Sequence, residues 1–176
     1  FNFSGFFLYV VSAPAVIYDL LGMSGKDFAW LFVPGISGVM FGAFLSGRLA
    51  ERLSPRRTVC QGYLIMACAV VFNIVYCLIF PPALPWTVLP VMIYTIGMAL
   101  AMPSVSLIAL DLFPKLRGMT SSLQGFAHSL FAGITAGVVS PLLSHNALTL
   151  ACGMGGAALL GGLAWALYLR VAGSTR

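Results

Sequence analysis

The sequence predicts an all-α membrane protein with six transmembrane helices. Of its 176 residues, 60% are hydrophobic and only 7% are charged, whereas a soluble domain carries about 25% charged residues. Such a chain has too few charged side chains to cover a surface that faces water. Apolar stretches of about 20 residues, the length that crosses a bilayer, recur along the chain, and the charged residues gather in the turns between them.

Six apolar segments are long enough to cross a bilayer. Their approximate boundaries are 3–21, 27–49, 58–80, 86–110, 119–143 and 147–169. A charged turn, G-R-L-A-E-R-L-S-P-R-R at 47–57, separates the second segment from the third. The third ends at Pro81, Pro82 and Pro85, because proline cannot continue a helix. A turn at 111–117 follows the fourth segment, and the polar stretch 144–146 ends the fifth.

The distribution of lysine and arginine predicts the orientation of the chain. The turn 47–57 carries four arginines, the turn 111–117 carries Lys115 and Arg117, and the tail carries Arg170 and Arg176. The opposite side of the membrane receives only Lys26. Because positively charged loops stay in the cytoplasm, this ratio of eight to one places both ends of the chain there.

Small residues recur within the predicted helices. Gly38 and Gly42 form a G-x-x-x-G pair in the second segment, and Gly133 and Gly137 form another in the fifth. Such pairs let helix backbones approach closely in lipid. They predict tight packing, and sliding between helices remains a compatible alternative.

The turn 47–57 resembles the loop motif G-x-L-A-D-R-x-G-R-R of the major facilitator superfamily. Gly47, Leu49, Ala50, Arg52 and Arg56 match that motif, Glu51 keeps the charge of its aspartate, and Ser54 and Pro55 depart from it. The resemblance implies a conformational switch, in which a charge-assisted network at the helix ends breaks when the two halves of a transporter move apart. The residues implied are Gly47, Glu51, Arg52, Arg56 and Arg57.

Two further stretches narrow this resemblance. The sequence Y-V-V-S-A-P at 9–14, followed by Asp19 and G-M-S at 22–24, is similar to the seventh helix of Bcr/CflA-type drug:proton antiporters. Phe113-Pro114, Gly118, Ser121-Ser122-Leu123 and Gly125 are similar to the link between the tenth and eleventh helices of that group. The resemblance implies the C-terminal half of a twelve-helix transporter of the bacterial inner membrane, made of two inverted three-helix repeats.

The same resemblance implies a function. The protein is expected to export drugs or small amphipathic compounds by alternating access, driven by protons and without a cofactor. Its partners would be the substrate, protons, the lipid bilayer and the missing N-terminal six-helix half, and that half would carry the coupling acids. No acidic residue of this chain lies in the middle of a predicted span. Asp19 is expected to act as a cap at the membrane interface, with a role in proton coupling as the alternative.

Six residues are candidates for the wall of a substrate cavity. Gln124 and His128 lie four apart and therefore on one helix face, and polar groups inside a membrane usually point into the bundle or a wet cavity. They are expected either to line the substrate path or to form a structural hydrogen bond, with proton relay by His128 a third possibility. Phe6, Tyr9, Met98 and Met102 offer soft aromatic and thioether surface for a drug, although core packing explains them equally well.

Other classes of protein remain open as alternatives. A transporter of another small solute fits the same motifs, and a six-helix assembly module without transport activity fits the hydropathy. Gly35-Ile36-Ser37-Gly38 and Ala127-His128 faintly resemble the serine and histidine motifs of rhomboid proteases, but their helices and spacing differ, so no enzyme is predicted. The basic residues do not form a nucleic-acid-binding face, and the four cysteines contain no C-x-x-C pair that would bind a metal.

The predicted orientation can be tested with single cysteines in a cysteine-free variant. Arg56→Cys is expected to resist a membrane-impermeant maleimide in intact cells and to react after lysis, because its turn faces the cytoplasm. Lys26→Cys is the control and is expected to react in intact cells. Labelling of position 56 from outside the cell would reverse the predicted topology.

Overall fold

The computed structural model describes residues 2–20, 22, 28–50, 52–81 and 83–174. Within these residues every regular element is a helix. The elements are α1 (Asn2–Val11), α2 (Ala13–Ala15), the π-helix η1 (Val16–Leu20), α3 (Ala29–Ala50), α4 (Pro55–Ile79), α5 (Leu89–Leu112), α6 (Arg117–Ile134), the π-helix η3 (Thr135–Val139), α7 (Ser140–Leu143) and α8 (Ala147–Ser174).

Five helical stretches of the described chain are long and apolar enough to cross a membrane. They are Ala29–Ala50, Pro55–Ile79, Leu89–Leu112, Arg117–Leu143 and Ala147–Ala172, and they correspond to the second through sixth predicted segments. The first predicted segment, 3–21, is divided into α1, α2 and η1, and its longest piece, α1, has 10 residues. The structure therefore shows an all-helical membrane fold with five candidate spans.

The predicted span boundaries differ from the structure by a few residues at several ends; α4, for example, begins at Pro55 rather than at Thr58. The fourth span was expected to begin at Trp86, but turns precede it and α5 begins at Leu89. The last span was expected to end at Leu169, yet α8 continues to Ser174. A helix does not have to end at the membrane surface, because an arginine such as Arg170 can extend its charged head into water from an apolar stem.

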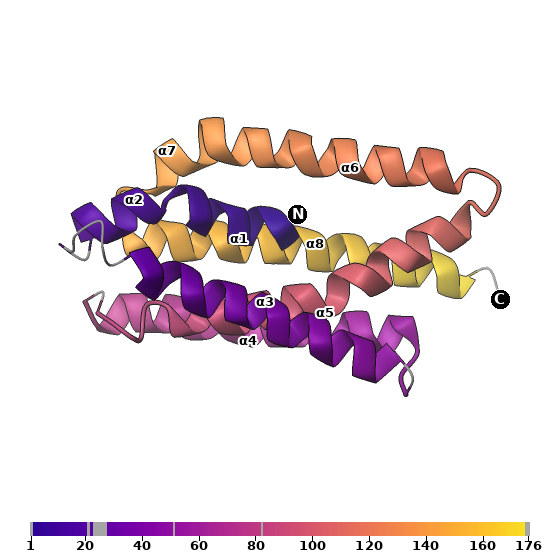
Figure 1. Ribbon diagram of the computed structural model, residues 1–176, viewed down its shortest axis with the longest axis horizontal. Helices are drawn as coiled ribbons and strands as arrows, with labels where there is room; N and C mark the ends of the chain where they lie inside the picture. Colours follow the sequence, from indigo (N-terminus) through magenta and orange to yellow (C-terminus); the bar gives the residue numbers. More distant parts are fainter. Residues whose placement is uncertain (1, 21, 23–27, 51, 82, 175–176) are drawn as a thin grey trace.

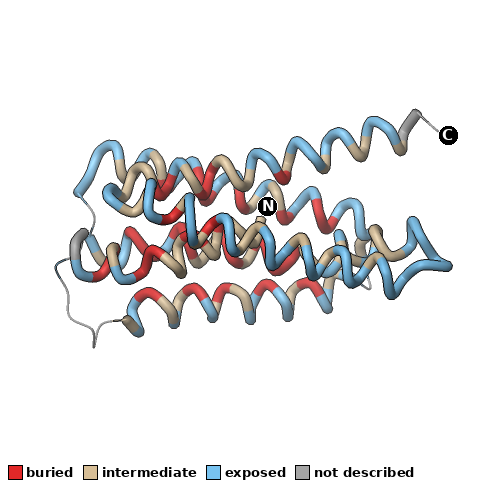
Figure 2. The backbone as a smooth tube through the Cα atoms, turned by 90° about the horizontal axis from the view of Figure 1, so that it is seen from above, coloured by how far each residue is buried: buried red, intermediate tan, exposed pale blue. Residues whose placement is uncertain are grey.

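The helices form two groups that α8 and the oblique α5 connect (Figure 1). In one group α5 packs along both α3 and α4. In the other, α8 lies beside α1 and α4, and α6 forms the opposite edge of the bundle. Figure 2 shows that buried residues recur at intervals along most of the helices, which therefore bury one face and expose another, whereas α6 buries none of its residues.

Two clusters of buried residues make the core. One joins α1, α2 and η1 to α3, the turn before α5, and α8, and consists of Leu8, Ala13, Val16, Ile17, Leu31, Val88 and Leu150. The other joins α4, α5 and α8, and consists of Met66, Ala69, Val70, Tyr94, Met98 and Met154.

Glycines allow α5 to approach its two neighbours closely. A Cβ added at Gly62 of α4 would lie 2.6 Å from the Gly97 carbonyl oxygen of α5, and one added at Gly97 would lie 2.6 Å from the Gly62 carbonyl oxygen. On α3, a Cβ at Gly42 would lie 2.5 Å from the Ile96 carbonyl oxygen, and one at Gly38 would lie 2.5 Å from the Met92 carbonyl oxygen. Close packing of the first G-x-x-x-G pair is thus confirmed.

The second G-x-x-x-G pair is placed differently. A Cβ added at Gly133 or Gly137 would meet no described atom within 4 Å. These glycines therefore face open space rather than another helix of the described chain.

A buried hydrogen bond joins the interruptions of two spans. The hydroxyl groups of Ser12, between α1 and α2, and Ser140, between η3 and α7, lie 2.9 Å apart. A proline follows each serine closely in the sequence: Pro14 comes two residues after Ser12, and Pro141 comes directly after Ser140. Proline removes a helix hydrogen bond, so an interruption of the helix is expected near Pro14 and near Pro141. The hydrogen bond between the two serines joins these two interruptions.

The close approach of helices around α5 predicts that alanine substitutions at two glycines change the free energy of unfolding differently. Gly62→Ala is expected to lower the free energy of unfolding by about 1–3 kcal/mol, because the new methyl group overlaps a backbone carbonyl that cannot move aside. Gly133→Ala, in open space, is expected to be neutral or stabilising by about 0.5–1 kcal/mol, because alanine favours the helix. Unfolding of both variants in mixed micelles measures the difference, and equal stabilities would contradict the packing described here.

Candidate functional site

One recess in the described structure has a volume of about 390 Å³. It lies between α5, α6 and α8, with the first residues of α1 at one end and Tyr63 of α4 in its wall. The lining residues are Asn2, Phe3, Tyr63, Met102, Val105, Ser106, Ile108, Ala109, Leu112, Gln124, Ala127, His128, Phe131, Gly161, Ala164, Trp165 and Tyr168. None of these side chains is acidic, lysine or arginine, so the recess is an apolar space with a few neutral polar groups.

The recess brings together three of the six predicted site residues. Met102 comes from α5, and Gln124 and His128 come from one face of α6. The Gln124 Nε2 atom is buried and has no hydrogen-bond partner among the described residues. The His128 ring is exposed at the rim and meets the edge of the Phe3 ring, with the ring centres 5.5 Å apart.

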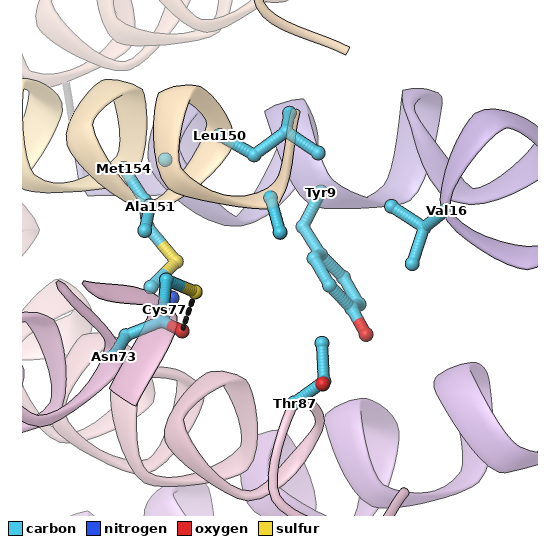
Figure 3. A pocket seen from close by; sticks show the side chains of 10 residues that line it. Tyr9, Val16, Asn73, Cys77, Thr87, Leu150, Ala151 and Met154 are labelled. Atoms are coloured by element: carbon cyan, nitrogen blue, oxygen red, sulfur yellow. Dashed lines mark hydrogen bonds between the residues drawn. The ribbon is translucent and has the colours of Figure 1, made fainter. Parts of the chain in front are cut away.

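The other three predicted site residues lie elsewhere. Met98 is 3% exposed and belongs to the core between α4, α5 and α8. Phe6 packs against the same core. Tyr9 lines a separate cavity of about 20 Å³ together with Asn73, Cys77 and Thr87, and its hydroxyl group has no hydrogen-bond partner among the described residues (Figure 3).

A polar network that the sequence did not predict surrounds the start of α1. The Asn2 side-chain amide donates to the Tyr63 hydroxyl oxygen over 2.8 Å, and the Tyr94 hydroxyl donates to the Asn2 carbonyl over 3.0 Å. Gly161 leaves room for this network, because a Cβ there would lie 2.9 Å from the Tyr63 hydroxyl oxygen and would overlap the Asn2 side chain. In the sequence, the only feature that could have indicated this network is that its polar residues lie inside apolar segments.

The predicted switch motif is described in part. Gly47 has no described neighbour within 4 Å of an added Cβ, and Glu51 lies outside the described residues, as do Lys26, Asp27 and Arg176. The Arg56 guanidinium carbon lies 5.8 Å from the centre of the Tyr168 ring. The charged network through Glu51, Arg52 and Arg57 remains a prediction.

The ion pair that the structure describes lies in the turn between α5 and α6. Arg117 Nη2 and Asp111 Oδ1 are 3.0 Å apart, and the two side chains are 62% and 56% exposed. Because exposed ion pairs contribute only about 0–1 kcal/mol, this pair shapes the turn more than it stabilises the fold. The side chain of Asp19 is outside the described part of the chain.

The arrangement does not assemble a protease or metal site within the described residues. The Ser37 hydroxyl of α3 donates to the Pro34 carbonyl over 2.9 Å. His128 contacts Phe3 of α1 and belongs to α6, which lies at the opposite edge of the bundle from α3. No group of three metal-binding side chains occurs within the described residues. The chemistry that the site offers is noncovalent contact with an apolar or amphipathic molecule.

Comparison with known proteins gives a family match over the whole chain. The sequence model of the Major Facilitator Superfamily matches residues 1–176. Searches of curated proteins and of solved structures return no significant match.

The network at the start of α1 predicts that removing one of its hydrogen bonds lowers the stability of the protein modestly. Tyr63→Phe is expected to lower the free energy of unfolding by about 1 kcal/mol, because it removes the acceptor of the Asn2 amide in an apolar setting. Tyr76→Phe is the matched control, since the Tyr76 hydroxyl makes an exposed bond with the Pro81 carbonyl, and its expected effect is smaller. Thermal unfolding in detergent measures both, and an equal loss in the two variants would contradict the role of the network.

Proposed function

Because the chain belongs to the Major Facilitator Superfamily, whose members are membrane transporters, we propose that it forms part of a proton-coupled exporter of drugs or small amphipathic compounds. The mechanism is alternating access, in which two six-helix halves move about a site near the middle of the membrane. This chain is the C-terminal half, with the charged turn 47–57 in the cytoplasm of a bacterial cell. The missing N-terminal half is its partner and holds the groups that carry protons.

The observation that carries the proposal, beyond the family match, is the division of α6 into two faces. None of the residues of α6 within Arg117–Ile134 is buried. Large apolar side chains follow one another at helical spacing along one face, and they are Met119, Leu123, Phe126, Leu130 and Ile134. Ser121, Gly125 and His128, at spacings of four and three, lie on a different face and are also exposed.

The two faces of α6 suit two different surroundings. The bulky apolar face matches lipid, whereas polar and small residues within a membrane span suit a wet cavity or a neighbouring helix. His128 is the proposed substrate contact on this second face. Behind it, Met102 and Gln124 form the wall, and Phe6 and Met98 belong to the core against which Met102 packs, whereas Tyr9 lines a separate cavity.

Proton coupling is assigned to the partner half because no carboxylate lies in the middle of a candidate span of the described residues. Of its four acidic residues, Asp111 is paired with Arg117 at the end of α5, and none lies in the middle of a candidate span. A buried or cavity-facing carboxylate is the usual proton carrier in such proteins. The described half therefore contributes substrate contacts and moving surfaces.

Transport by the full-length protein tests the proposal in inverted vesicles with an acidified interior. Addition of an exported compound is expected to raise the interior pH, because protons leave in exchange for the compound. Absence of proton movement with every member of a broad panel of amphipathic drugs would remove the antiport proposal. Uptake without proton movement would favour another solute or coupling ion within the same superfamily.

The proposed substrate contact predicts the effect of one substitution. His128→Ala is expected to slow export by about tenfold, the loss that one substrate hydrogen bond of about 1.4 kcal/mol would cause. Leu130→Ala, on the lipid-facing side of the same helix, is the control and is expected to retain the rate of export. Equal rates for the two variants, at equal amounts in the membrane, would contradict a substrate contact at His128.

A further inference from the structure

The small cavity beside Tyr9 contains polar groups that the proposed function does not use. It lies between α1, η1, α4, α8 and the turn before α5, and its volume is about 20 Å³. We propose that this cavity is the binding site of one water molecule, which bridges the hydroxyl groups of Tyr9 and Thr87. The water site does not depend on the transport function proposed above.

The Tyr9 hydroxyl is the group that requires a partner. It is buried, and none of the described residues forms a hydrogen bond with it. Burial of a hydroxyl without a partner is costly, so most buried hydroxyls in proteins are bonded to protein atoms or to ordered water. Lipid offers no replacement for the missing bond. A bound water molecule removes this cost.

Thr87, in the turn before α5, offers the second bonding group. Its side chain is 7% exposed, and its hydroxyl accepts from the Ala83 N–H and donates to the Ala83 carbonyl, each over 3.1 Å. A hydroxyl oxygen has two lone pairs, so one acceptor position of Thr87 remains. Figure 3 shows that the Tyr9 ring directs its hydroxyl toward the side of the cavity on which Thr87 lies. A water molecule between them accepts from the Tyr9 hydroxyl and donates to Thr87 Oγ1.

The size and lining of the cavity fit water rather than another occupant. A water molecule needs roughly 10–15 Å³ of such space, so the cavity admits one water and is too small for a drug or a lipid chain. Cavities that stay empty are apolar, whereas Tyr9, Asn73 and Thr87 bring polar side chains to this one from three separate elements. On the Asn73 side, the Cys77 thiol donates to Asn73 Oδ1 over 3.8 Å.

The remaining wall of the cavity is apolar and belongs to the core. Val16 and Leu150 line the cavity and are members of the first buried cluster. The water therefore lies at the edge of a packed core. Its two hydrogen bonds link the interrupted first span to the turn from which α5 begins.

Removal of the Tyr9 hydroxyl tests the proposal, because a wet and a dry cavity predict opposite changes in stability. Tyr9→Phe in the full-length protein is expected to lower the Tm in mixed micelles by about 2 °C, since one hydrogen bond to the water is lost. In a dry cavity the same substitution removes an unpaired hydroxyl and raises the Tm. A raised or unchanged Tm would overturn the proposal.

Tyr18→Phe is the matched control for the loss of a hydroxyl. The Tyr18 side chain is 52% exposed, so its hydroxyl does not depend on a buried partner, and no shift in Tm is expected. If Tyr18→Phe lowered the Tm as much as Tyr9→Phe, the loss at Tyr9 would not report the cavity and the proposal would fail.

A double-mutant cycle tests whether the two hydroxyls share one water. Thr87→Val keeps the shape of the side chain and removes its hydroxyl. In the Thr87→Val background, Tyr9→Phe is expected to lower the Tm by less than half as much as in the unmodified protein, because the water has already lost one partner. Loss of the bonds to Ala83 is common to both members of the comparison and cancels. Equal shifts in the two backgrounds would contradict the bridge.

A cryo-electron microscopy map of the full-length protein in nanodiscs, at a resolution that shows ordered water, gives the direct observation. A separate peak is expected about 2.7–2.8 Å from both the Tyr9 and the Thr87 hydroxyl oxygen atoms. An empty cavity in that map, or a direct hydrogen bond between the two hydroxyls, would overturn the proposal.

Discussion

The fold depends on how closely α5 approaches α3 and α4. Lipid chains are as apolar as leucine, so helices in a bilayer gain little from burying apolar side chains against one another. Their association instead rests on close van der Waals contact and on interhelical hydrogen bonds. Gly62 and Gly97 meet with their backbones almost touching, and Gly38 and Gly42 admit the Met92 and Ile96 carbonyl groups. This three-helix contact holds the core residues Met66, Tyr94 and Met98 in place.

The sequence predicted the helices well because span length and turn chemistry are local properties. Five of the six predicted segments are recovered as candidate spans, and the first G-x-x-x-G pair packs as expected. The rotation of each helix was harder to predict. Most of α5 is apolar on all sides, so nothing in its composition distinguishes buried Met98 from Met102 at the recess. On α6, Gln124 and His128 stand out against apolar neighbours, and both line the recess.

The network of Asn2, Tyr63 and Tyr94 could not be predicted for a different reason. Its bonds join residues that are 61 and 92 positions apart in the sequence, and tyrosine inside an apolar segment is common enough to carry no signal. Gly161, which makes room for the network, resembled the other glycines of its segment. Long-range contacts of this kind emerge only when helices are assembled, because they depend on depth and rotation together.

The described structure combines a tightly packed group with a loosely attached edge. The packed group is α3, α4 and α5, and the edge is α6, which buries no residue within Arg117–Ile134. At the end of the bundle where α2 and α7 lie, Ser12 and Ser140 tie the two interrupted spans together. This division suits a transporter half in which one surface stays rigid while another faces a cavity and a partner domain.

The central claim is that the face of α6 with Ser121, Gly125 and His128 borders a water-filled path. Reaction of single cysteines with a charged, water-soluble thiol reagent in membranes of the full-length protein tests it most directly. Ser121→Cys and Gly125→Cys are predicted to react and to be protected by an exported compound, whereas Phe126→Cys and Leu130→Cys are predicted to stay unreactive. Equal reactivity on both faces, or no reaction at positions 121 and 125, would contradict the account.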